Sequence, residues 1–94
     1  MTRIETIRVL LEQKLHPLSV EIEDESHLHA GHAGAATGRG HFKLHIVSPD
    51  FEGRTLVARH RLVYDALGEL MQTEIHALSI RALTPDETAT PKTA

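Results

Sequence analysis

Three short segments of this sequence alternate between apolar and polar residues, which is the pattern of β-strands that bury one face. They are residues 18–24 (LSVEIED), 41–48 (HFKLHIVS) and 74–83 (EIHALSIRAL). A chain with such strands must cover the apolar face of their sheet and can leave the polar face to solvent. This requirement limits the fold more strongly than any other feature of the sequence.

Apolar residues at helical spacing lie before and between these strands. They predict one helix from residue 4 to 15, ended by Pro17, and a second from residue 56 to about 71. Thr84 and Pro85 are typical of the start of a short last helix. The first two strands should pair as an antiparallel hairpin, whereas a helical crossover makes the third strand parallel to its neighbour. The sequence therefore predicts an α+β fold, with a three-stranded mixed sheet and helices packed on one face.

The composition is that of a single small globular domain. The 94 residues are 40% apolar and 24% charged, contain no cysteine and carry a formal net charge of −3. We expect residues 1–88 to form the domain and residues 89–94 to be a disordered tail. No apolar run reaches the roughly 20 residues that span a bilayer. The amphipathic N-terminal segment does not predict a signal peptide, so we expect no contact with membranes and a cytoplasmic location.

A connection rich in histidine joins the first two strands. It comprises residues 26–40 (SHLHAGHAGAATGRG), and connections of this length are usually functional or disordered. His27 and His29 could both reach a metal ion from an extended segment. Histidines at this density are also common as solvated loop residues, and for His27 and His32 the pattern favours the solvated alternative.

Other histidines lie in the predicted strands and in the second helix. His41 and His45 fall on the polar face of the second strand, where we expect them to be exposed, and His60 falls in the apolar stripe of the helix. His76 stands at the start of the third strand, in phase with the buried face, at the edge of the sheet. The spacing leaves open whether His76 is a structural edge residue or a ligand.

No arrangement of residues indicates an enzyme. Ser26 stands beside His27 and near His29, but no third group or oxyanion device accompanies them in the sequence. No glycine-rich phosphate motif follows a strand, and the carboxylates of residues 21–25 are typical of a solvated strand edge. We therefore expect no catalytic residues and no small-molecule substrate.

Six pieces of the sequence, in their order and spacing, resemble the BolA family. They are IEDES (22–26), His29, HFKLHIVS (41–48), FEGRTL (51–56), RHRLVYDAL (59–67) and IHALSIRALTP (75–85), within a resemblance that covers residues 3–85. The BolA-like fold is similar to the type II KH domain, with the order helix–strand–strand–helix–helix–strand. The resemblance implies this fold here, with a short extra helix just after Gly53.

The resemblance also implies a cofactor and a partner. BolA-like proteins pair with monothiol glutaredoxins, and the heterodimer holds a [2Fe–2S] cluster whose sulfur ligands come from the glutaredoxin cysteine and from glutathione. The matching ligand positions in this chain are His29 in the connection and His76 in the last strand, with His27 and His32 as alternatives to His29. Some members carry a cysteine in the loop, so this cysteine-free chain resembles the histidine-loop branch. We expect no cluster on the isolated chain.

Some members of the family are described as transcriptional regulators, which gives an alternative function. A KH domain clamps nucleic acid with a GxxG loop, but the corresponding FEGRTL has one glycine and an acidic residue. Lys43, Arg54, Arg59 and Arg61 could still form a basic face that contacts DNA, or they could be solvated surface residues. The net charge of −3 counts against DNA binding, which depends on clustered positive charge.

Overall fold

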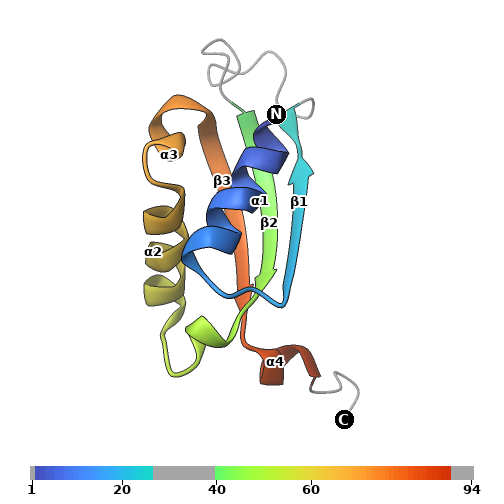
Figure 1. Ribbon diagram of the computed structural model, residues 1–94, viewed down its shortest axis with the longest axis vertical. Helices are drawn as coiled ribbons and strands as arrows, with labels where there is room; N and C mark the ends of the chain where they lie inside the picture. Colours follow the sequence, from blue (N-terminus) through green and yellow to red (C-terminus); the bar gives the residue numbers. More distant parts are fainter. Residues whose placement is uncertain (1, 27–39, 90–94) are drawn as a thin grey trace.

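The computed structural model describes residues 2–26 and 40–89 (Figure 1). Its elements, in chain order, are α1 (Arg3–Lys14), β1 (Ser19–Asp24), β2 (Gly40–Val47), the 3-10 turn η3 (Pro49–Phe51), α2 (Leu56–Leu67), α3 (Leu70–Thr73), β3 (Ile75–Leu83) and α4 (Pro85–Ala89). The predictions for His27, His29, His32 and residues 90–94 of the predicted tail lie outside the described residues. Ala89, the first residue of that predicted tail, is the last residue of α4. None of the described helices is long and apolar enough to cross a membrane.

The strands form one sheet in the order β1-β2-β3. β1 and β2 pair antiparallel, and β2 and β3 pair parallel, so the predicted three-stranded mixed sheet is confirmed. The starts of β2 and β3 lie at the same end of the sheet as the end of β1, and α4 lies at the opposite end (Figure 1). Residues that are distant in the sequence therefore meet at each end of the molecule.

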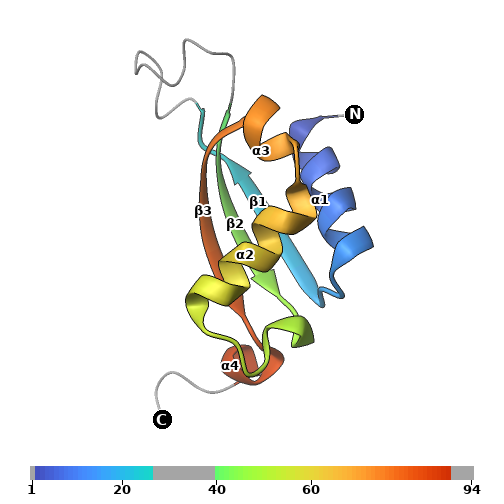
Figure 2. The same ribbon diagram turned by 90° about the vertical axis from the view of Figure 1, so that its left-hand side faces the viewer.

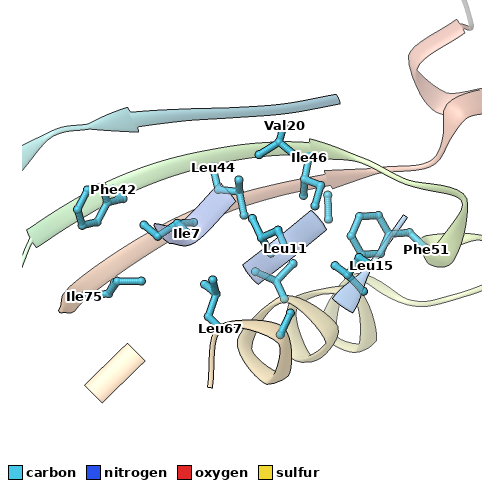
Figure 3. Close-up of a cluster of buried hydrophobic side chains, with 13 residues drawn as sticks. Ile7, Leu11, Leu15, Val20, Phe42, Leu44, Ile46, Phe51, Leu67 and Ile75 are labelled. Carbon is cyan, nitrogen blue, oxygen red and sulfur yellow. The ribbon is translucent and has the colours of Figure 1, made fainter. Parts of the chain in front are cut away.

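The helices α1 and α2 cover one face of the sheet (Figure 2). The core fills the space between the two layers (Figure 3) and consists of Ile7, Leu11, Leu15, Val20, Phe42, Leu44, Ile46, Phe51, Val63, Ala66, Leu67, Ile75 and Ala82. Burying each of the larger aliphatic or aromatic side chains contributes about 1.5–3 kcal/mol to folding. The alternation in β1 and β2 therefore has the predicted consequence, with one face of the sheet in the core and the other open.

The second helix is shorter than predicted. It ends at Leu67 because Gly68 adopts a positive φ of 54°, which glycine tolerates without steric cost, and the chain then forms the separate helix α3.

The short helix expected just after Gly53 lies before that glycine instead, as the 3-10 turn η3. The predicted last helix is confirmed, and its start forms a capping box: Thr84 Oγ1 accepts from the Glu87 N–H, and the Glu87 carboxylate accepts from the Thr84 N–H.

Candidate functional site

His76 lies near the start of β3, and its side chain is exposed. The prediction that it is in phase with the buried face is wrong, because the register between β2 and β3 shifts: Gly40 pairs with Ile75, whereas His41 pairs with Ala77. Ile75 is fully buried in the core. An extra residue in one strand of a pair redirects the side chains beside it, and here it leaves His76 outside the core.

The side chain of His41 lies on the same face of the sheet as His76. His41 precedes the buried Phe42 on β2, and successive side chains of a strand point to opposite faces, so His41 faces away from the helices. The prediction of an exposed His41 is wrong, however, since only 8% of it is accessible to solvent. The imidazole rings of His41 and His76 are in contact, with centroids 5.0 Å apart and planes tilted by 50°.

The residues on either side of the undescribed connection lie beside this pair. Ser26 Oγ accepts a hydrogen bond from the His41 N–H over 3.0 Å, and the Glu25 N–H donates to the His41 carbonyl over 2.8 Å. Gly40 directly precedes His41 and is itself part of β2. We call the end of the sheet formed by Ser26, Gly40, His41 and His76 the histidine edge.

Gly40 fits this edge because it has no side chain. A Cβ atom there would lie 2.5 Å from the ring of Phe42, which is in the core, and 3.1 Å from Ser26 Oγ. The Gly40 N–H donates to the carbonyl of Glu74, the residue before β3, over 2.9 Å. The close packing of Phe42 and Ser26 against the start of β2 therefore depends on glycine at this position.

The donor atoms at the histidine edge suit part of a metal site. Within residues 2–26 and 40–89, no three histidine, cysteine, aspartate or glutamate side chains are arranged to hold a metal ion. The exposed imidazole of His76 is a suitable ligand for iron when it is neutral. An iron–sulfur cluster of the [2Fe–2S] type needs four protein or thiol ligands. The described residues therefore fit such a cluster only if other ligands come from outside them.

The predicted basic face is not a single surface in the structure. Lys43 alternates with core residues of β2 and lies exposed on the open face of the sheet, whereas Arg61 is exposed on α2, in the helical layer. Arg54 precedes α2, and its Nε donates to the Asp50 carbonyl over 2.9 Å. Because the sheet separates Lys43 from α2, these cations do not present one continuous positive surface.

Arg59 departs furthest from that prediction, because it is only 8% exposed. Its Nη1 donates to the Glu87 carboxylate over 2.7 Å and to the Ala82 carbonyl over 3.0 Å, and its Nε donates to the Arg54 carbonyl over 3.1 Å. The hydrogen bonds from Arg59, followed by the one from the Thr84 N–H, lower the pKa of Glu87 to about 2 from its ordinary value of 4.5. Arg59 therefore joins α2 to β3 and α4 and is not part of a solvent-facing basic surface.

A mixed three-stranded sheet with helices on one face defines this chain as a small α+β domain. The family described as "BolA-like protein" matches residues 11–87. The chain therefore belongs to the BolA family.

Its relatives are similar over most of this chain. "Protein BOLA1, chloroplastic" of Arabidopsis thaliana is 48% identical over 88 residues, 90% of this chain and 55% of that protein. The "DNA-binding transcriptional regulator BolA" of Haemophilus influenzae is 40% identical over 86 residues, 87% of this chain and 81% of that protein. The solved BolA domain of SufE1 from Arabidopsis thaliana is 47% identical, with a TM-score of 0.81, and the match covers 93% of this chain and 96% of that one. The chain spans about half the length of the Arabidopsis BOLA1 and mouse BolA-like protein 1.

Proposed function

We propose that this protein is the partner of a monothiol glutaredoxin and co-ligates a [2Fe–2S] cluster shared with it, in cytoplasmic iron–sulfur cluster trafficking or iron regulation. In this proposal His76 and one histidine of the connection, His29, are the ligands from this chain. The observation that carries the proposal is the position of exposed His76 at the histidine edge, where the chain enters and leaves the connection. His29 follows Ser26 by three residues, a length of chain that spans at most about 11 Å.

The ligand chemistry supports a site divided between two molecules. The chain has no cysteine, so any thiolate must come from the glutaredoxin and from glutathione. Replacing two thiolates by imidazoles raises the reduction potential of a [2Fe–2S] cluster. The role proposed for this chain is therefore to bind the cluster and tune its potential, without catalysis.

The contribution of the fold is to hold one ligand at a fixed place. His76 belongs to β3, which is paired with β2 along its length, and ligands on strands or helices are placed more precisely than ligands on loops. Its imidazole must be deprotonated on the nitrogen that binds iron, so acid should weaken the shared site. The open face beside His76 leaves access for a partner protein.

The test is reconstitution with a monothiol glutaredoxin, glutathione, iron and sulfide, followed by visible circular dichroism and size-exclusion chromatography. The wild-type chain should give a heterodimer with a mixed-ligand spectrum. His76→Ala should weaken cluster binding by more than about 10-fold, because a direct ligand matters at least as much as the groups behind it. His29→Ala should weaken it less if His27 or His32 can replace His29.

His45→Ala is the matched control, since His45 lies on the same face of β2 but pairs with Glu21 and Arg81, away from the histidine edge. It should leave the spectrum unchanged. A spectrum identical to that of glutaredoxin alone, with no heterodimer on the column, would show that the proposal is wrong.

DNA binding is the second candidate, and the name of the Haemophilus influenzae relative favours it. If DNA is the ligand, the affinity for it should fall steeply as salt concentration rises. Either Lys43→Ala, on the open face of the sheet, or Arg54→Ala and Arg61→Ala, beside and on α2, should reduce the slope of that dependence, according to which side faces the DNA. Buried Arg59 should contribute to stability and not to this slope. A salt-dependent complex with duplex DNA, together with failure of the reconstitution, would move this candidate to first place.

A further inference from the structure

We propose that His41 is a positioning residue for His76, holding the His76 imidazole in one orientation at the histidine edge before a cluster binds. The functional consequence of this inference rests on the proposed function. The contact between the two rings, however, is present in the chain without any partner. It assigns a role to a residue of β2 that is neither of the two proposed ligands.

The backbone of His41 is hydrogen-bonded to the two residues that follow β1. Its N–H donates to Ser26 Oγ over 3.0 Å, and its carbonyl accepts from the Glu25 N–H over 2.8 Å. The residue is only 8% exposed, although its side chain lies on the face of the sheet that the helices leave open. A side chain that is buried on a strand paired on both sides has little freedom to change rotamer.

His76 is less restrained by itself. It is exposed at the point where the register between β2 and β3 shifts. Within residues 2–26 and 40–89, its ring takes part in no hydrogen bond, and the contact with the His41 ring, at 5.0 Å between centroids, is the one that orients it. Removing the fixed ring should therefore let the exposed ring sample several rotamers.

A ligand that is ordered in advance loses less conformational freedom when it binds. Groups that orient a metal ligand typically change metal affinity by about 10- to 100-fold when they are removed. A ring contact without a hydrogen bond belongs at the lower end of that range. We therefore expect His41→Ala to raise about 10-fold the glutaredoxin concentration needed to form half of the shared cluster.

The experiment compares three variants with the wild-type chain. His41→Ala removes the ring, and His41→Phe keeps an aromatic ring but has no nitrogen to bind metal. His45→Ala is the matched control, because it removes an imidazole from the same strand and face, and the His45 Nδ1 atom has no hydrogen-bond partner among the described residues. Each chain is measured first alone, by NMR couplings that report the χ1 rotamer of His76, and then in the reconstituted complex by visible circular dichroism.

The expected result is one His76 rotamer in the wild-type, His41→Phe and His45→Ala chains, and averaged couplings in His41→Ala. The midpoint of complex formation should shift in His41→Ala alone.

An unchanged His76 rotamer in a folded His41→Ala chain would overturn the proposal. The proposal would also be overturned if both His41 variants lost the cluster while their His76 ring stayed in one rotamer. That result would make His41 itself a ligand. If the wild-type chain forms no complex, the proposed function fails, while the NMR measurement still decides whether His41 orients His76.

Discussion

Arg59 shows how the surroundings of one residue change the meaning of its charge. Its position beside His60 and Arg61 in the sequence suggests a basic surface, yet its guanidinium is buried among Arg54, Ala82 and Glu87. A buried cation needs partners for each of its donors, because a lost hydrogen bond inside a protein costs more than the bond contributes when it is made. The role of Arg59 is therefore to hold α2 against the last strand and helix.

We predict that Arg59→Ala lowers the free energy of unfolding by about 2 kcal/mol. The Ala82 carbonyl loses the hydrogen bond from Arg59, and a space is left between α2 and α4. Urea unfolding followed by far-ultraviolet circular dichroism measures the loss. Arg61→Ala, on the exposed side of the same helix, should change the free energy by no more than about 0.5 kcal/mol. Equal effects of the two substitutions would show that the hydrogen bonds of the buried Arg59 guanidinium are not what stabilises this region.

Among the elements, β2 decides the geometry of the histidine edge. It is the central strand, so it sets the place of β1 on one side and of β3 on the other. The register shift beside Gly40 lies at its first residue, where the chain returns from the undescribed connection. The orientation of His76 on β3 therefore depends on how β2 begins.

We predict that Gly40→Ala destabilises the protein by about 1–3 kcal/mol, as overpacking of a close contact does, and also disturbs the histidine edge. The new methyl group would lie 2.5 Å from the Phe42 ring, which cannot move away without opening the core. Amide chemical shifts of His41 and His76, together with urea unfolding, measure the two effects.

Gly53→Ala provides the comparison for this prediction. Gly53 has a φ of 73°, and a methyl group added to it would meet no atom within 4 Å, so the substitution strains only the backbone, by about 1–2 kcal/mol. It should reduce stability and leave the chemical shifts at the histidine edge unchanged. Unchanged shifts in Gly40→Ala would mean that the start of β2 tolerates a side chain.

At the scale of the whole molecule, the histidine edge and the ion pair of Arg59 with Glu87 lie at opposite ends of the sheet. The histidine edge lies where β2 and β3 start, and the ion pair of Arg59 with Glu87 lies where β3 leads into α4 (Figure 1). The pKa of Asp50 is also below its ordinary value: burial acts to raise it, but hydrogen bonds from His16 and Ser48 outweigh that effect. Folding therefore favours the ionised forms of Glu87 and Asp50, which both lie away from the histidine edge.

This arrangement predicts how stability depends on pH. Because the pKa of Glu87 is lowered to about 2 in the folded protein, its contribution is fully present above its ordinary value of 4.5 and is lost as the pH falls from about 4.5 to about 2. Glu87→Gln should be less stable than the wild type at pH 7, and the difference should shrink over that acid range. Urea unfolding at a series of pH values measures the difference.

Glu12→Gln is the control for the pH series, since Glu12 is exposed on α1 and has no ion pair among the described residues. Its difference from the wild type should stay small and constant with pH. A difference between Glu87→Gln and the wild type that persists unchanged at pH 2 would contradict the assignment of the acid-sensitive ion pair to Glu87.

The sequence by itself determined the three strands, their antiparallel and parallel pairing, the helices on one face and the short last helix, because these follow from local periodicity and from the lengths of the connections. Its motifs also indicated the BolA family and directed attention to His76. The tertiary structure alone decided the register shift at Gly40, the exposure of His76, the burial of His41 against it and the internal role of Arg59. Each of these depends on contacts between residues far apart in the chain. Alternation within one strand indicates which face its side chains take, but it does not show at which residue a bulge shifts the alignment with the next strand.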